Sequence, residues 1–239
     1  MDMTGMPQPL NTFNSEIVKH PITWGVTKLE DHPHFALQIL QTIATWSASD
    51  QNLAIVITNF LHSDIEIVSE MLRDLRPEAI SKAIDTGARF RLNPDHYRLF
   101  ATSLATTKAS RNRRNEFAHH IWGTSEAIPD ALILADPKDL NREMVAMTGP
   151  IQRGLGVGRT PRYDHGLPWD TSKYYVYRAN DLQSTLDDAR RAEKIINLLR
   201  AMSMINPPFF NQASFDSICV QLEADLQIQQ ALQLKSKQK

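Results

Sequence analysis

The residues best suited to chemistry in this sequence form one short segment near the middle of the chain. Within two helical turns it holds Arg113, Arg114, Asn115, His119 and His120. A guanidinium is planar, permanently charged and shaped to bind phosphate oxygens in pairs, whereas an imidazole near neutral pH takes up and returns a proton. Chemistry on a phosphodiester needs both side-chain types. The sequence therefore predicts a phosphate-directed site in this segment.

The spacing of the segment decides which of its side chains can act together. At about 100° per residue the directions of Arg114 and His119 differ by about 140°, so the two do not share one face of a regular helix. Asn115 and His119 are four residues apart and do share a face, so the amide can hold the imidazole in one tautomer. The long side chain of Arg114 then reaches the same anion by swinging around, or reaches it from a partner chain.

Five further residues are candidates for supporting roles. Asp50, in the first predicted long helix, would orient the guanidinium of the site. His120 would share in the proton transfer, and Arg113 would contact a substrate phosphate. Arg111 and Arg159 are candidate substrate-binding cations, which belong to two locally basic stretches of an otherwise balanced chain.

The same residues also allow structural interpretations. Arg114 would form an ion pair with Asp50, and His119 would bind carbonyl groups at a helix C-terminus, where a positive charge is favourable. The stretch Gly154–Arg159 is interpreted as a mobile basic loop, because it lacks the Gly-Lys-Ser/Thr ending and the strand-to-helix context of a phosphate loop. No metal site is expected, since adjacent helical histidines diverge by about 100° and the single cysteine, Cys219, fits an apolar packing pattern.

Composition limits the partners and the setting of the chain. Its 239 residues include 26 Lys and Arg against 27 Asp and Glu, a net charge of −1, so any anion site must be local. No apolar run approaches the roughly 18 residues of a membrane span. One cysteine and an opening segment without the layout of a signal peptide predict a reducing, cytoplasmic setting. No cofactor is expected.

Apolar periodicity predicts an all-α fold, a bundle of about four to six helices with a small two-stranded β-hairpin insertion. The helices are expected from Pro33 to near His62, after Ser63-Asp64, from Pro77, from Asn93 to Trp122 where Gly123 would end the helix, after Asn180-Asp181, and from about Ala213. Short apolar stretches at 131–135 and 174–177 predict two strands that pair across an irregular excursion. The expected organisation is an extended arm (1–30), a bundle (31–210) with the insertion at about 124–178, and a C-terminal helix with a polar tail (211–239).

The pattern Arg114-Asn115-x-x-x-His119 resembles the signature of the HEPN superfamily (higher eukaryotes and prokaryotes nucleotide-binding). In that signature an Arg, usually followed by a polar residue, precedes a His by four to six intervening residues. The following Ile121-Trp122-Gly123, and Trp46-Ser47-x-x-Asp50 in the first long helix, also look like bacterial members of the group. The resemblance covers residues 33 to 205, but only the six-residue motif is specific. It implies a helical bundle that dimerises with two motifs facing one cleft.

The resemblance implies a metal-independent endoribonuclease that works as a homodimer in bacterial phage defence, a toxin–antitoxin pair or stress response. A ribose 2′-hydroxyl of a single-stranded or tRNA-like RNA would attack the adjacent phosphorus, with His119 moving the proton and Arg114 stabilising the developing charge. The alternative is a non-catalytic HEPN-like module that binds a nucleotide or a partner protein through Arg114 and the loop 153–162. A third hypothesis is a structural helical protein in which the motif is an ion network at a helix end.

Overall fold

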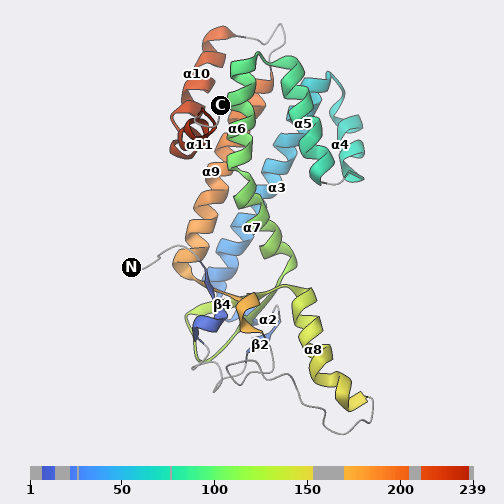
Figure 1. The fold of residues 1–239 in the computed structure, drawn as a ribbon, viewed down its shortest axis with the longest axis vertical. Coiled ribbons are helices and arrows are strands. Elements are labelled where there is room, and N and C mark those ends of the chain that lie inside the picture. The colour runs from blue at the N-terminus through green and yellow to red at the C-terminus, as the bar shows by residue number, and fades with distance from the viewer. Residues whose placement is uncertain are drawn as a thin grey trace. The chain divides into compact units, whose positions relative to one another are not determined.

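The chain folds as two compact units (Figure 1). The computed structural model describes residues 7–13, 22–25, 27–75, 77–152, 170–204 and 211–236. Unit 1 comprises Met1–Ile43 and Arg113–Asp187, and unit 2 comprises Ala44–Asn112 and Asp188–Lys239. Three helices contribute residues to both units: α3 (Pro33–Leu61), α7 (Lys108–His119) and α9 (Ala179–Ser203).

Unit 1 is built on a five-stranded antiparallel sheet with the strand order β1-β5-β4-β3-β2. Its strands are β1 (Gln8–Pro9), β2 (Thr23–Trp24), β3 (Ile121–Thr124), β4 (Ala131–Ala135) and β5 (Tyr175–Arg178). In the centre of the sheet Ile133 of β4 lies opposite Gly123 of β3 and Val176 of β5. The two edge strands come from the N-terminal segment of the chain. The shorter elements and one further helix of this unit are η1 (Leu10–Phe13), α2 (Thr27–Glu30), α8 (Pro137–Gln152) and η2 (Thr171–Lys173).

The central strand β4 is buried along its whole length, because apolar side chains cover both faces of the sheet. Successive residues of a strand point to opposite faces. Ile133 accordingly packs in one cluster with Leu10 and Tyr174, whereas Leu134 packs in another with Phe117 of α7. The second cluster fixes the end of α7 against the sheet.

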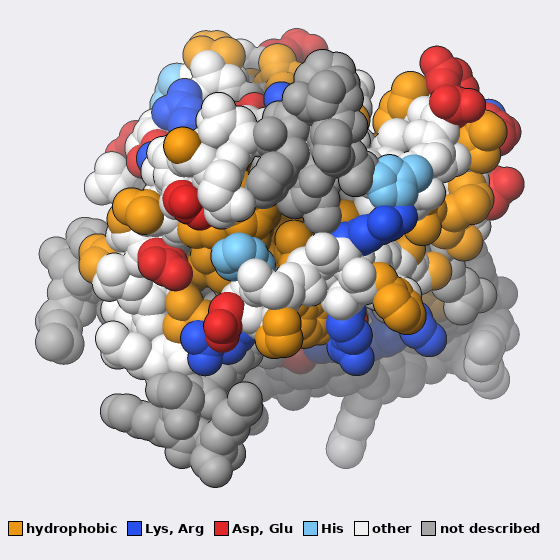
Figure 2. Space-filling model, turned by 90° about the horizontal axis from the view of Figure 1, so that it is seen from above, with side chains coloured by type: hydrophobic (Ala, Val, Ile, Leu, Met, Phe, Trp, Pro, Cys, Tyr) orange, Lys and Arg blue, Asp and Glu red, His pale blue; other side chains and the backbone are white. Residues whose placement is uncertain are grey.

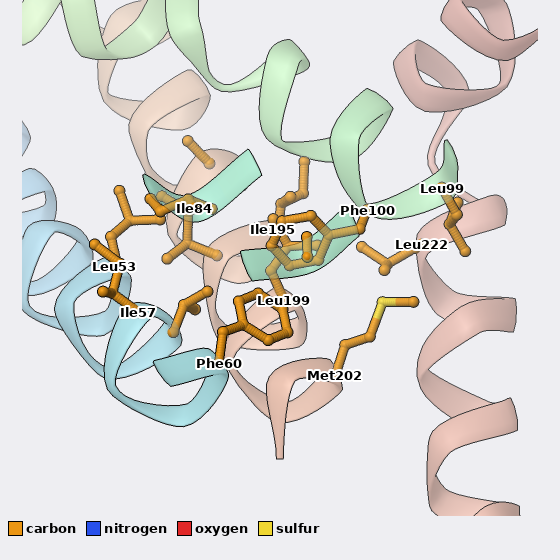
Figure 3. Close-up of a cluster of buried hydrophobic side chains, with 14 of the residues drawn as sticks. Leu53, Ile57, Phe60, Ile84, Leu99, Phe100, Ile195, Leu199, Met202 and Leu222 are labelled. Atoms are coloured by element: carbon orange, nitrogen blue, oxygen red, sulfur yellow. The ribbon is translucent and has the colours of Figure 1, made fainter. Parts of the chain in front are cut away.

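Unit 2 is helical in all its described parts. Besides segments of α3, α7 and α9 it contains α4 (Ile65–Arg73), α5 (Pro77–Arg91), α6 (Pro94–Thr106), α10 (Gln212–Glu223) and α11 (Leu226–Ser236). Figure 3 shows its core, in which Ile57 and Phe60 of α3 point toward Phe100 of α6 and Leu199 of α9. This cluster is separate from the two that cover the sheet of unit 1.

Several helix ends follow local signals that the sequence displays. Asn93 caps α6, since its side-chain oxygen accepts a hydrogen bond of 2.8 Å from the backbone N–H of His96. At the start of α9 the carboxylate of Asp181 accepts a hydrogen bond of 2.8 Å from the backbone N–H of Arg178. Helix α3 ends before His62, whose φ of 51° is the left-handed conformation that commonly terminates a helix.

The predicted fold class, an all-α bundle with a small two-stranded hairpin, is wrong. The protein is mixed α/β, because its sheet has five strands and not two. The predicted pairing of 131–135 with 174–177 is confirmed by β4 and β5. The strands that escaped prediction, β1, β2 and β3, have two to four residues, which is too short for a visible alternation of apolar and polar side chains.

The helix predicted from Asn93 to Trp122 also differs in the structure. It is divided into α6 and α7, and the chain leaves α7 at His119 to enter β3. Gly123 therefore lies in a strand and does not end a helix. A Cβ atom at this position would lie 2.6 Å from Cε3 of Trp24, so the glycine makes room for an indole ring on the neighbouring strand.

Two further segments differ from their predicted structure. The excursion between the two predicted strands was expected to be irregular, but it begins with the 16-residue helix α8. The single helix expected after residue 211 is divided into α10 and α11, which meet at Ala224 and Asp225.

Candidate functional site

The C-terminal part of α7, in unit 1, carries the predicted phosphate-directed segment. Phe117 is buried, and its ring makes edge-to-face contacts with Trp122 and Tyr177 at centroid distances of 5.2 and 5.3 Å. The rings of Trp122 and Tyr177 also meet, at 5.8 Å. Such aromatic pairs stabilise a structure beyond the area that they bury. This aromatic cluster holds the end of α7 in place, so the exposed side chains around it project from a fixed helix end.

Arg113 is committed to this aromatic cluster. Its Nη1 donates a hydrogen bond of 2.7 Å to the hydroxyl oxygen of Tyr177 and lies 3.6 Å from a carboxylate oxygen of Glu116. Burial raises the pKa of Tyr177 to about 12, against the opposing influence of Arg113, so the phenol stays neutral at physiological pH. Arg113, predicted to support the chemistry through a substrate phosphate, thus has a structural partner that sequence reasoning missed.

Arg114 and Asn115 are brought together by the structure. Nη1 of Arg114 donates a hydrogen bond of 3.0 Å to Oδ1 of Asn115. The guanidinium is half-buried and the amide is exposed. The predicted hydrogen bond from Asn115 to the ring of His119 is absent from the described residues, where the amide oxygen accepts from Arg114 instead. Asn115 therefore orients the arginine of the motif.

His119 is the last residue of α7 and is exposed to solvent. Within the described ranges its ring makes no hydrogen bond and no ion pair. The neighbouring His120 is less exposed, and its Nε2 lies 3.9 Å from Oδ2 of Asp136, a contact between charges only when the ring is protonated. The two adjacent histidines thus have different surroundings.

The predicted residues Asp50 and Arg111 meet one another in unit 2. Nη2 of Arg111 donates a hydrogen bond of 2.9 Å to Oδ1 of Asp50, which links α7 to α3. Trp46 strengthens the same link, since its indole N–H donates a hydrogen bond of 3.0 Å to the hydroxyl of Ser110. The charge of Arg111, predicted to bind substrate, is balanced here by a carboxylate. Arg159 and the whole basic loop 153–162 lie outside the described residues.

Among the residues with described positions, no group of three or more His, Cys, Asp or Glu side chains converges in a way that could hold a metal ion. No helix in the described ranges combines the length and the apolar character that crossing a bilayer requires. Comparison with family models, curated proteins and solved structures gives no match to this chain.

Proposed function

We propose that the protein is a metal-independent endoribonuclease whose site is formed by the end of α7. The observation that carries the proposal is the exposed imidazole of His119, five residues after a guanidinium that Asn115 orients. A ring in contact with water can receive a substrate proton, and an oriented guanidinium can bind a phosphate. The proposal depends on these side chains and not on a bundle fold.

In the proposed reaction a ribose 2′-hydroxyl attacks the adjacent phosphorus and the bond from phosphorus to the 5′ oxygen breaks. His119 accepts the proton of the 2′-hydroxyl, and a proton returns to the departing 5′ oxygen. Arg114 stabilises the negative charge that builds up on the non-bridging oxygens. The products are a 2′,3′-cyclic phosphate and a 5′-hydroxyl. Single-stranded or tRNA-like RNA is the proposed substrate, cut in the cytoplasm during bacterial defence or stress response.

The directions of Arg114 and His119 on α7 bear on the oligomeric state of the enzyme. They differ by about 140°, so a single helix end does not aim both side chains at one phosphate. In the proposed homodimer, Arg114 of one protomer and His119 of the other serve the same phosphate. A mixture of Arg114→Ala and His119→Ala proteins would then recover about a quarter of wild-type activity, because half of the dimers are mixed and each has one intact site.

The decisive experiment compares His119→Ala with wild type on single-stranded RNA in the presence of EDTA. Loss of the proton carrier should lower cleavage by about 10²–10⁴-fold, with no change in the thermal unfolding curve. His34→Ala, at another exposed histidine of unit 1, is the matched control and should cleave normally. Equal cleavage by wild type and His119→Ala would refute the nuclease.

A second candidate function is a non-catalytic module that binds a nucleotide or a partner protein. The observation that favours it is the engagement of Asn115 with Arg114, which leaves the imidazole of His119 without a side chain that fixes its tautomer in the described structure. Nucleotides should then raise the melting temperature of wild type, and Arg114→Ala should abolish that shift. RNA cleavage in EDTA separates this function from the first.

A further inference from the structure

Unit 2 carries an apolar groove along α5 that the proposed nuclease does not use. Its volume is about 720 Å³. The groove is lined by Phe60, Leu61, Ala79, Lys82, Ala83, Thr86, Gly87, Phe90 and Arg91. Phe90 is 83% exposed, which is unusual for a phenylalanine beside an apolar groove. In Figure 2 apolar side chains lie next to Lys and Arg side chains on a face of unit 2.

The side chains along the groove have the spacing of a helix-packing surface. Ala79, Ala83, Thr86 and Phe90 follow one another at steps of four, three and four residues, so they form one stripe along α5. Three of the four are small, and small side chains let a second helix approach closely. At the bottom of the groove Gly87 packs directly against Phe60, because a Cβ atom on Gly87 would lie 2.8 Å from Cβ of Phe60. The groove therefore fits a helix laid along it.

The charges that line the groove are positive. Lys82 and Arg91 are its only ionisable lining residues in the described part of the chain. The guanidinium of Arg91 is held in place, since its Nε donates a hydrogen bond of 3.1 Å to the carbonyl oxygen of Phe60. A helix with acidic residues beside its apolar face is the complementary partner. The chain's own tail does not meet this description, because residues 235–239 contain three lysines and no acid.

Helix α4 has the complementary properties. It is nine residues long, and Val68 is its only fully buried side chain. Ile67 and Met71 lie on one face and are 59% and 46% exposed, with Glu66 and Glu70 beside them. A helix this short is marginal without tertiary packing. Acidic and apolar side chains meet at the right of Figure 2, on the side where Figure 1 shows α4.

We propose that α4 of a second copy of this chain occupies the α5 groove, and that the contact is reciprocal. Ile67 and Met71 of one protomer would pack on the stripe of the other that is formed by Ala79, Ala83, Thr86 and Phe90. Glu66 and Glu70 would face Lys82. Because α4 and α5 are consecutive in the chain, a two-fold axis can apply both contacts at once. The interface lies in unit 2, and within the nuclease proposal it is this contact that joins the two protomers whose α7 ends share a phosphate. Mass and cross-linking test the contact whether or not the protein cleaves RNA.

Light scattering after gel filtration tests the dimer with the full-length protein. Wild type should have about twice the 27.1 kDa mass of one chain at micromolar concentration. Phe90→Asp should be monomeric and still fold, because the ring is largely exposed within one chain, and its melting temperature should no longer rise with protein concentration. Leu234→Asp, at a residue of α11 that is 64% exposed and outside the groove, is the matched control and should stay dimeric. A monomeric wild type, or a dimeric Phe90→Asp, overturns the proposal.

Charge reversal tests which helix enters the groove. Lys82→Glu alone, and Glu66→Lys with Glu70→Lys, should each raise the dimer dissociation constant by about tenfold. All three changes together should restore it. No recovery in the triple variant would overturn the pairing of α4 with the groove.

Cross-linking tests the same contact directly. The only cysteine is Cys219, so Cys219→Ser gives a background without thiols. In this background Met71→Cys and Ala83→Cys proteins should form a disulfide-linked dimer when they are mixed and oxidised. Absence of this mixed product, when the same proteins are dimeric by light scattering, overturns the proposed contact.

Discussion

The close approach of Gly123 and Trp24 allows a quantitative test of the sheet that carries the end of α7. A Cβ atom at residue 123 would lie 2.6 Å from Cε3 and 2.9 Å from Cζ3 of the Trp24 ring. Two carbon atoms normally approach no closer than about 3.5 Å, so the ring or strand β2 must move by about 0.9 Å in Gly123→Ala. Overpacking of this kind costs about 1–3 kcal/mol.

An opposing effect reduces the net change. Alanine restricts the unfolded chain more than glycine does, which stabilises by about 0.4–1 kcal/mol where the backbone conformation is compatible. Among the described glycines only Gly25 has a positive φ, so the backbone at Gly123 is one that alanine can adopt and this gain applies. The expected net loss for Gly123→Ala is therefore about 1.3 kcal/mol from the midpoints of the two ranges, or a fall of roughly 3–5 °C in melting temperature for a chain of this size.

A double-mutant cycle separates the two effects. In a Trp24→Ala background the ring is gone, and Gly123→Ala should be neutral or stabilising by about 0.5 kcal/mol. Urea unfolding followed by circular dichroism gives all four free energies of unfolding. The expected coupling between the two positions is about 1–3 kcal/mol. If Gly123→Ala costs the same in both backgrounds, the indole ring is not the reason for a glycine at this position.

Substitutions at three further positions test contacts that each lie within one unit. Tyr177→Phe removes the acceptor of the Arg113 hydrogen bond and should lower the free energy of unfolding by about 1–2 kcal/mol in a urea titration. In unit 2, Nε of Arg191 donates a hydrogen bond of 2.8 Å to Oδ2 of Asp225. Burial opposes ionisation there, but the hydrogen bonds and charge of Arg191, together with the backbone N–H groups of Ile228 and Gln227, hold the pKa of Asp225 below its ordinary value. A lowered pKa means that the carboxylate stabilises the fold above its unfolded pKa of about 3.9 and that this contribution disappears as the pH falls through the folded pKa. The difference in melting temperature between wild type and Asp225→Asn should therefore be full at pH 6 and should shrink in acid; a constant difference would contradict this linkage. Asn93→Ala removes the cap of α6 and should cost about 1 kcal/mol by thermal unfolding, whereas Asn93→Gly should cost only a few tenths.

The helices were predictable where their signals are local. The long apolar stripe that begins at Pro33 gives α3, and its end near His62 is confirmed, because both features depend on residues close together in the sequence. Asn93 followed by a proline likewise fixes the start of α6. These signals do not require knowledge of the rest of the fold.

Apart from the pairing of β4 with β5, the sheet was not predictable, because its edges depend on pairing between distant segments. Gln8 lies opposite Val176, and Trp24 lies opposite Gly123, in strands of only two residues on the N-terminal side. Such strands have no periodicity of their own. The apolar residue Trp122 fits a helix pattern equally well, and only its pairing with Leu134 of β4 makes it part of a strand.

In the candidate site, too, the local features were predictable and the contacts between distant residues were not. The residue types and the spacing of Arg114, Asn115 and His119 can be read from the sequence, and they remain the basis of the proposed function. The hydrogen bond between Arg113 and Tyr177 could not be read, because it joins positions far apart in the chain. The spacing of four residues from Arg113 to Phe117 is a local signal that separates it from the arginine that follows, but this spacing does not identify Tyr177 as its partner.

The rotational setting of α7 explains the arrangement of its side chains. Phe117 is buried in the cluster on the sheet, and Arg113, four residues earlier, lies within about 40° of it, so its guanidinium also faces the sheet. Asn115 and His119 are each about 160° from Phe117 and are both exposed. Arg114 is intermediate in direction and is half-buried. The burial of Phe117 thus turns Arg113 toward the sheet and His119 toward the solvent. Alanine at Arg113 should therefore lower the stability of the fold, whereas alanine at His119 should leave stability unchanged and lower only the proposed cleavage.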